Sequence, residues 1–479
     1  MVTRRQMLAG ASALAVAGAG PATTASATGL AGDIRILRRA YETMHPGLYR
    51  YATPQQMNRW FSELEAAWAD EPPLRDLYLS LSRFLARIKC GHTYANFYNQ
   101  KKDVASALFA GPDKLPFHFR WLGGRMFVTA YGGDALPRGS EILAIDGRPV
   151  EEIVASLMPY ARADGSNDAK RIAQLEVQGF DRFETFDIFF ALERNRSGAP
   201  FDVRTSRGPM RLDPIDLTTR RAQMPSRANE DNAPMWTLEL DGTGAARLVM
   251  PDWSTYDTKW DWRRFLDDSF GQLASHNVQS LIVDLRGNEG GEDCGDEIIA
   301  RCIDAPLQRA SYERRVRYRK SPADLDPVLD TWDPSFKDWG NDAQPLANGF
   351  YRLIEKDGAS RAPITPKGPR FRGKLIVLVD ATNSSATFQF ANTVQGSRLG
   401  VLVGSPTGGN LRGINGGAFF FLRLPASGLE ADLPVIGTFP ATPQPDRGLT
   451  PDILVTDSAE DIAAGRDAVL DLARAVARG

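Results

Sequence analysis

One stretch decides the fold, and it reads Lys374-Leu375-Ile376-Val377-Leu378-Val379-Asp380-Ala381-Thr382-Asn383-Ser384-Ser385-Ala386-Thr387-Phe388. Residues 375–379 form a short, continuous apolar run, which is typical of a buried strand. Asp380 ends that run, and the residues from Ala386 to Val394 predict an amphipathic helix. Ser385 therefore stands where a strand turns into a helix.

A serine at this turn is compatible with two roles. The helix dipole and the free N–H groups of a helix N-terminus can stabilise an oxyanion, and Ala386 would supply one of these donors. A serine before a helix is equally suited to act as a simple cap. Ser384 is the adjacent alternative for the nucleophile. The stretch alone leaves catalysis and capping open.

The sequence around this stretch predicts an α/β fold. Strands and helices alternate from Trp236 onward, which is the pattern of an α/β core. We assign the core to residues 235–479, with an insertion around residues 311–370 that is rich in Pro, Asp and Trp. The expected strands cover residues 246–250, 280–284, 374–379, 399–403 and 419–424, and the expected helices cover residues 260–274, 296–303 and 386–394.

The second feature with chemical potential is a glycine-rich turn after the strand at 280–284. It reads Asp284-Leu285-Arg286-Gly287-Asn288-Glu289-Gly290-Gly291. Glycines permit positive φ and let backbone N–H groups point into a cleft. The spacing fits neither the P-loop nor the dinucleotide-binding fingerprint. A plain turn and a loop whose Gly290 or Gly291 N–H groups hold an oxyanion are the alternatives.

The third feature is a histidine. The protein has only 4 histidines, and His92 lies in a polar turn between Gly91 and Thr93. A neutral imidazole is the usual base for a serine hydroxyl. The other histidines have surroundings that predict structural roles, and they are His45, His118 and His276.

The N-terminal half predicts a helical part followed by strands. Residues 28–112 carry apolar residues at helical spacing in three segments, with Thr53 as the cap of the second, and we expect a helical cap. Residues 139–150 resemble the recurring "G-x-E-I-L-x-I-D-G-x-P-V" segment of PDZ domains, so a PDZ-like module is assigned to residues 113–163. Residues 164–234 are polar and form a linker or extension, in which residues 186–190 and 201–205 look like strands.

The first 27 residues read as a twin-arginine signal peptide. Arg4 and Arg5 precede an apolar, Ala/Gly-rich stretch, and residues 25–27 supply small side chains for cleavage. The apolar stretch is too short for a spanning helix. A coincidental basic N-terminus and a retained anchor are the alternatives. We expect a periplasmic or secreted protein with no membrane span in its mature form.

The composition of the chain bears on which binding partners and cofactors are expected. Lys and Arg number 57 and Asp and Glu 59, and the net charge of −2 gives no reason to expect nucleic acid as a partner. The 3 cysteines lack metal-ligand spacing, and we expect neither a metal nor another cofactor.

Together these features resemble the C-terminal-processing (tail-specific) serine peptidase family and its tricorn-core relatives. The turn at 284–291 is similar to the family's "D-L-R-x-N-x-G-G" oxyanion loop, and residues 383–391 are similar to its nucleophile segment. Residues 404–410 and 448–453 resemble its glycine-rich turn and its closing "G-I-x-P-D-I" segment. The resemblance implies a ClpP/crotonase-like core, the nucleophile Ser385 and a peptide or protein substrate.

One departure from the family pattern decides the expected mechanism. Members with a Ser-Lys dyad carry lysine where this chain has Asn410, and asparagine cannot act as a general base. The tricorn-like branch uses Ser and His with a helping serine and an acid. His92 fits the base of that branch, although Gly91 stands where tricorn has the helping serine. Asp446 is the expected acid, ahead of Glu430 and Asp452.

The resemblance therefore implies an exported endopeptidase or carboxy-terminal-processing peptidase that acts through a Ser-His acyl-enzyme. His92 would take the proton of Ser385, and the N–H groups of Gly290 or Gly291 and of Ala386 would hold the oxyanion. Two alternatives are a non-catalytic binding protein of the same fold and a crotonase-type enzyme that acts on thioesters. The signal peptide and the PDZ-like segment speak against the second.

Overall fold

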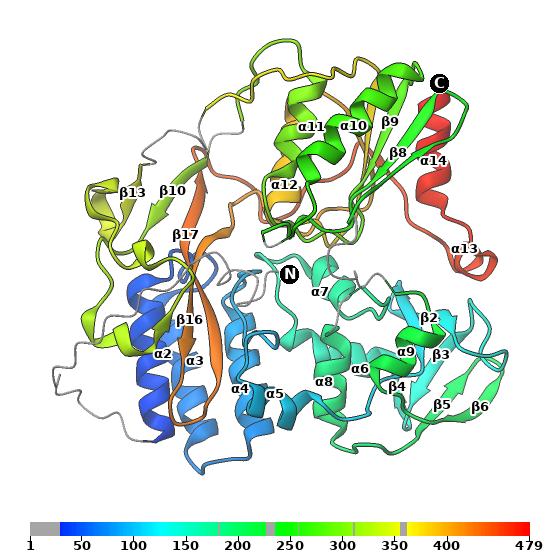
Figure 1. The fold of residues 1–479 in the computed structure, drawn as a ribbon. Coiled ribbons are helices and arrows are strands. Elements are labelled where there is room, and N and C mark those ends of the chain that lie inside the picture. The colour runs from blue at the N-terminus through cyan, green and yellow to red at the C-terminus, as the bar shows by residue number, and fades with distance from the viewer. Residues whose placement is uncertain (1–28, 181–182, 227–234, 257, 310–311, 355–361) are drawn as a thin grey trace.

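The structure is a computed structural model, and it describes residues 29–180, 183–226, 235–256, 258–309, 312–354 and 362–479. The signal-peptide prediction for residues 1–27 lies outside the described residues. Figure 1 shows a mixed α/β molecule with several sheets, in which the chain runs from a helical region through two regions of mixed structure. No helix in the described ranges is both long and apolar enough to cross a membrane.

The N-terminal helices form as the apolar spacing predicts. Thr53 caps the second of them through a capping box with Gln56, and Pro54 occupies its first turn. Each helix buries one apolar stripe against the others and against later parts of the chain. These helices are α2 (Leu30–Met44), α3 (Pro54–Trp68), α4 (Leu74–Arg87) and α5 (Lys102–Phe109).

A six-stranded antiparallel sheet follows, in the order β1-β2-β3-β5-β6 with β4 paired to β3. Its strands are β1 (Phe117–Leu122), β2 (Arg125–Tyr131), β3 (Glu141–Ile145), β4 (Arg148–Pro149), β5 (Phe201–Thr205) and β6 (Gly208–Leu212). The strand expected at 201–205 is confirmed, and it pairs with β3. The helices of this region are α6 (Val150–Leu157), α7 (Asp168–Gln174), α8 (Thr185–Arg194) and α9 (Leu217–Gln223).

The strand predicted at residues 186–190 is wrong, because these residues lie in α8. Phe186 and Phe190 are one helical turn apart, and their rings stack with centroids 4.9 Å apart. Four apolar residues interrupted only by Asp187 fit a buried helix as well as a strand. Packing of α8 into the core decides between them, and most of its side chains are buried.

The C-terminal core is a sheet in the order β18-β15-β14-β9-β8-β7, parallel except for the β7–β8 pair. Alternate residues of β14 face opposite sides: Leu375, Val377 and Val379 pack toward one helical layer, and Ile376 and Leu378 pack against α14. A parallel sheet covered on both faces explains the continuous apolar run. The strands are β7 (Thr237–Leu240), β8 (Ala245–Val249), β9 (Ser280–Asp284), β14 (Lys374–Val379), β15 (Val401–Gly404) and β18 (Ile453–Leu454).

The helices of this core lie on both sides of the sheet, as Figure 1 shows. One face carries α10 (Trp262–Ser275), α11 (Cys294–Cys302) and α12 (Ser385–Gly396), and the other carries α14 (Ala468–Arg478), while α13 (Ala459–Ala464) contacts β2 of the antiparallel sheet. The predictions of helices at 260–274, 296–303 and 386–394 are confirmed within three residues at either end.

The strand predicted at 419–424 is confirmed as a strand, but it begins earlier and belongs to a third sheet. This sheet has the order β11-β16-β17-β10-β13-β12, and its long β16–β17 hairpin reaches from the core to α2 (Figure 1). Its strands are β10 (Tyr312–Val316), β11 (Leu329–Asp330), β12 (Ala343–Pro345), β13 (Tyr351–Leu353), β16 (Asn415–Arg423) and β17 (Glu430–Pro440). The expected insertion thus supplies four strands to this sheet, and two of them, β10 and β11, pair with the hairpin directly.

Candidate active site

Ser385 is the first residue of α12, directly after the turn that follows β14. Its φ of 52° lies in the left-handed region, which costs a residue other than glycine about 1–3 kcal/mol. Ser384 is the residue before the helix, and its side chain makes no capping hydrogen bond. Neither serine therefore acts as a simple cap. Both serines line a cleft, but Ser385 is half-buried, whereas Ser384 is only 3% exposed.

Asn383 holds the turn that presents Ser385. Its Nδ2 donates to the carbonyl oxygens of Leu285 at 2.6 Å and Asn288 at 3.0 Å, which lie in the loop after β9. Its own carbonyl accepts hydrogen bonds from the N–H groups of Gly408 and Gly409. The fully buried Asn383 thus joins the loops that follow β9, β14 and β15, which are neighbouring strands of the sheet.

Gly290 lies against the nucleophile. A β-carbon at this position would come 2.7 Å from Ser385 Cβ and 2.9 Å from Ala386 N, so only glycine leaves this space open. The Gly290 N–H donates to Asn288 Oδ1 at 2.8 Å. Since the first N–H groups of a helix have no partner within it, Ala386 N faces this space as a donor. The Gly291 φ of 139° is also one that favours glycine.

His92 is half-buried and lines the same cleft as Ser385. Its ring lies 5.7 Å from the Phe419 ring, measured between centroids, and a β-carbon at Gly416 would be 3.6 Å from its Cε1. No hydrogen bond joins His92 to Ser385 in the described part of the chain, and such bonds are often long before substrate binds. Burial lowers the pKa of His92, and the Asp164 carboxylate opposes that shift.

The turn that carries His92 is fixed from behind by buried polar groups. Thr93 Oγ1 and His45 Nε2 are 2.9 Å apart, and Asn415 Nδ2 donates to the Cys90 thiol at 3.4 Å. Burial, together with Arg50, lowers the pKa of His45 to about 3, so its ring is neutral. These contacts place the imidazole of His92 on the cleft side of the turn.

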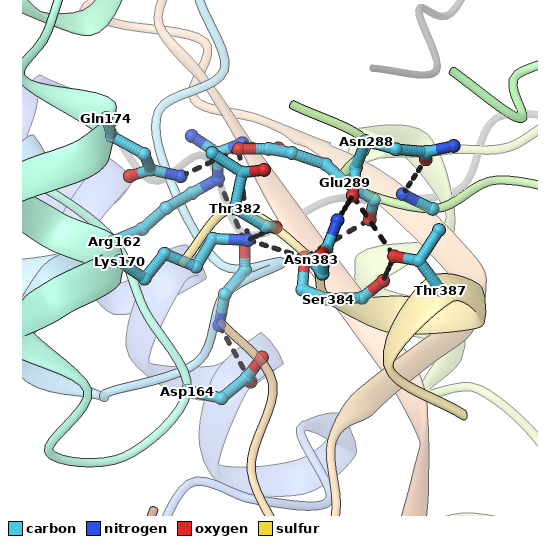
Figure 2. Close-up of polar contacts among 12 residues, drawn as sticks. Arg162, Asp164, Lys170, Gln174, Asn288, Glu289, Thr382, Asn383, Ser384 and Thr387 are labelled. Carbon is cyan, nitrogen blue, oxygen red and sulfur yellow. Dashed lines mark hydrogen bonds and ion pairs between the residues drawn. The ribbon is translucent and has the colours of Figure 1, made fainter. Parts of the chain in front are cut away.

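A network of charged residues joins the His92 turn to the loop after β9 (Figure 2). Arg162 donates to Gly91 O at 2.8 Å and to Glu289 Oε2 at 2.9 Å. Lys170, which is 1% exposed, donates to Ser384 Oγ at 2.5 Å and lies 3.8 Å from Glu289 Oε1. Burial would raise the pKa of Glu289, but Lys170 and Arg162 outweigh it and hold this pKa at about 2.

Asp164 is the carboxylate beside the His92 turn. Its Oδ1 accepts a hydrogen bond from Gly91 N at 2.9 Å, and a β-carbon at Gly91 would come within 2.7 Å of its Oδ2. The Asp164 carboxylate therefore occupies the space that a side chain at position 91 would need. Across the residues that the structure describes, neither Asp164 Oδ2 nor His92 Nδ1 has a hydrogen-bond partner, and both atoms are buried.

Asp446 lies elsewhere. Its Oδ1 accepts hydrogen bonds from Asn410 Nδ2 at 2.7 Å and from Ser166 N at 3.0 Å, and it does not line the cleft. Asn410 is fully buried and also donates to Asp164 O. Of the two other acids considered, Asp452 bonds Leu402 N and Glu430 is buried in β17, and neither lines the cleft.

The structure thus brings Ser385, Ala386, Gly290, Gly291 and His92 to one cleft and leaves Asp446 outside it. The cleft encloses about 1780 Å³, more than a site for a small molecule needs, and its size suits a polymer. Sequence reasoning missed three side chains of the network, Arg162, Asp164 and Lys170. They lie at the end of the proposed PDZ-like module and in the polar linker, and no local pattern marks them.

No metal centre is evident within the described ranges, where no three His, Cys, Asp or Glu side chains lie close enough to hold an ion. The arrangement instead offers a serine hydroxyl, an imidazole whose pKa is lowered by burial, and backbone N–H donors in one cleft. That combination can activate a hydroxyl, stabilise an oxyanion and transfer an acyl group.

The comparisons name the family. Residues 245–419 match the model of Peptidase family S41, so the chain carries a domain of that family and is a serine-type peptidase. The chain is similar to the solved structure of mature CPAF complexed with lactacystin, with 15% identity, coverage of 93% of this chain and 96% of that one, and a TM-score of 0.60. It resembles a second structure of mature CPAF at 14% identity, with coverage of 93% and 95% and a TM-score of 0.58. This likeness shows a shared fold. Comparison with curated proteins finds no match.

Proposed function

We propose that the chain is an exported serine peptidase that hydrolyses peptide bonds through an acyl-enzyme on Ser385, with His92 as the general base. The observation that carries the proposal is that Ser385, which lies against Gly290, lines the same cleft as His92 and that this cleft is large enough for a polypeptide. We further propose that residues 235–479 form a ClpP/crotonase-like core and that residues 113–163 contribute to a PDZ-like module. Export through the twin-arginine signal at residues 1–27 is part of the same proposal.

The reaction would begin with attack of Ser385 Oγ on the carbonyl carbon, while His92 takes the hydroxyl proton. The N–H groups of Gly291 and Ala386 are the proposed oxyanion donors, because Gly290 N–H already bonds to Asn288. His92 then gives the proton to the leaving nitrogen as the C–N bond breaks. Water, deprotonated by His92, attacks the ester and releases the acid.

Two carboxylates are candidates for supporting the His92 imidazolium. Asp446 is the candidate that the sequence suggests. Asp164 is the candidate that the structure suggests, because it accepts a hydrogen bond from Gly91 N and its negative charge raises the pKa of His92. We propose Asp164 for this role. It would substitute for the helping serine of tricorn, whose position is occupied here by Gly91. Asp446 would position the Asp164 segment through Asn410 and Ser166.

Hydrolysis of a fluorescently labelled, unfolded protein tests this proposal. Ser385→Ala and His92→Ala should each abolish turnover, and Ser384→Ala, the matched control for register, should leave measurable turnover. Asp164→Asn should lower kcat by about a hundredfold or more, because an uncompensated imidazolium is costly, and Asp446→Asn should lower it less. A well-folded wild type without turnover on any peptide, or full activity in Ser385→Ala, would contradict the proposal and favour the binding-protein alternative.

A further inference from the structure

Three aromatic side chains form one wall of the cleft next to His92. Phe419 and Phe421 come from β16, and Trp332 comes from the segment between β11 and β12. The Trp332 ring lies 5.7 Å from that of Phe419 and 5.9 Å from that of Phe421, measured between centroids. We call these three residues the aromatic wall.

The aromatic wall faces the cleft because of the strand period. Along β16, Phe420 and Leu422 point to the opposite face and are fully buried in the core of the N-terminal helices. Phe419 and Trp332 are only half-buried and present apolar surface to the cleft. Ile414 and Ile436 extend the same lining.

Two glycines keep the cleft surface beside His92 and the aromatic wall free of side chains. Gly416 lies beside the imidazole, and the exposed Gly417 finds only Ile436 Cδ1 at 3.9 Å and Arg314 Nη2 at 4.0 Å near its missing β-carbon. A bulge interrupts the β16–β17 register between Gly416 and Phe419. A substrate side chain that enters here would meet ring faces and edges, contacts that favour large apolar groups.

We propose that the aromatic wall is a subsite that binds a large apolar side chain of the peptide substrate, aromatic before aliphatic, beside the bond that Ser385 attacks. This inference rests on the proposed function and names its substrate class: polypeptides with a bulky apolar residue next to the cleavage point. Trp332 makes the segment between β11 and β12 a determinant of specificity. Transfer of an aromatic side chain from water to this wall supplies the binding energy.

Calorimetry on the Ser385→Ala variant tests the subsite without turnover. The probes are capped hexapeptides of Ser and Ala that carry one Phe, placed in turn at each position, and the same peptide without Phe. Phe at one position should tighten binding about tenfold or more, the order expected for a large apolar group in an apolar pocket. Adding Phe419→Ala or Trp332→Ala should remove that gain, and Phe419→Leu should keep part of it.

The matched control is Trp60→Ala, which removes a half-buried tryptophan from α3, away from the cleft, and should leave the gain intact. No preference for Phe at any position, or a preference that survives both aromatic-wall variants, overturns the subsite. Turnover of the same peptides by the wild type separates the two claims. Cleavage without a preference for Phe would refute the subsite but support the peptidase proposal. A preference for Phe in binding without any cleavage would support the subsite but refute the peptidase proposal.

Discussion

Gly290→Ala is the most informative single substitution, because the distances around Gly290 allow the expected loss of activity to be calculated. The added β-carbon would lie 2.7 Å from Ser385 Cβ, 2.8 Å from Ser384 O and 2.9 Å from Ala386 N. Carbon atoms in contact prefer about 3.5–4.0 Å, so the nucleophile turn must move by about 1 Å. A misplacement of about 1 Å can cost roughly a hundredfold in rate, which is about 2.7 kcal/mol of transition-state stabilisation.

Gly124→Ala is the matched control for this substitution. Gly124 lies in the exposed turn between β1 and β2, away from the cleft, and has a φ of 80°, so alanine there suffers the same kind of backbone strain, about 1–3 kcal/mol. Its β-carbon would meet no atom within 4 Å. Gly124→Ala should therefore lose stability but keep kcat within a few-fold of the wild type.

The assay is steady-state hydrolysis of a fluorogenic peptide, with the melting temperature of both variants measured alongside. Gly290→Ala should lower kcat by about a hundredfold with little change in KM, because the crowded groups act mainly in the transition state. If Gly290→Ala and Gly124→Ala have the same kcat when both variants are folded to the same extent, the reasoning about the Gly290 loop is refuted.

Two further predictions concern pH and stability. The acid limb of the pH profile of kcat/KM should have its midpoint below 6.5, because burial lowers the pKa of His92 and the base must be neutral. Asp164→Asn removes a negative charge that raises this pKa, so the midpoint of the variant should be lower still. A midpoint that moves up in Asp164→Asn would contradict the assignment. Arg220→Met should lower the free energy of unfolding by about 3–5 kcal/mol in urea titrations, because it leaves the buried Glu184 and Asp187 without their cation. The control is Arg264→Met, which breaks the exposed ion pair with Asp268 and should lower the free energy of unfolding by less than about 1 kcal/mol.

Much of the core could be predicted from sequence because its signals are local. The strands β9 and β14 fall at the predicted bounds, since a parallel sheet buried on both faces leaves continuous apolar runs that end in turn residues. The α8 helix was mistaken for a strand because a short, mostly apolar run such as residues 186–190 suits both structures. Its burial on several sides is a property of the tertiary packing.

The site was predictable only in part, for a similar reason. Ser385, His92 and the Gly290-Gly291 turn each carry a local pattern of turn and flanking elements. Asp164 and Lys170 carry none, because their roles depend on how residues 160–175 dock against the His92 turn and the Glu289 loop. Lys170 also fills space near Gly408, in the turn where the sequence places Asn410 instead of lysine. A basic residue therefore lies near that turn, but it bonds Ser384 and not Ser385.

The central claim is that Ser385 is the nucleophile and that it depends on His92. Labelling with a fluorophosphonate probe, followed by mass-spectrometric location of the adduct, tests it most directly. We predict one adduct, on Ser385 and not Ser384, that is lost in Ser385→Ala and strongly reduced in His92→Ala. An adduct on Ser384, or a well-folded wild type that takes up no probe, would contradict the claim.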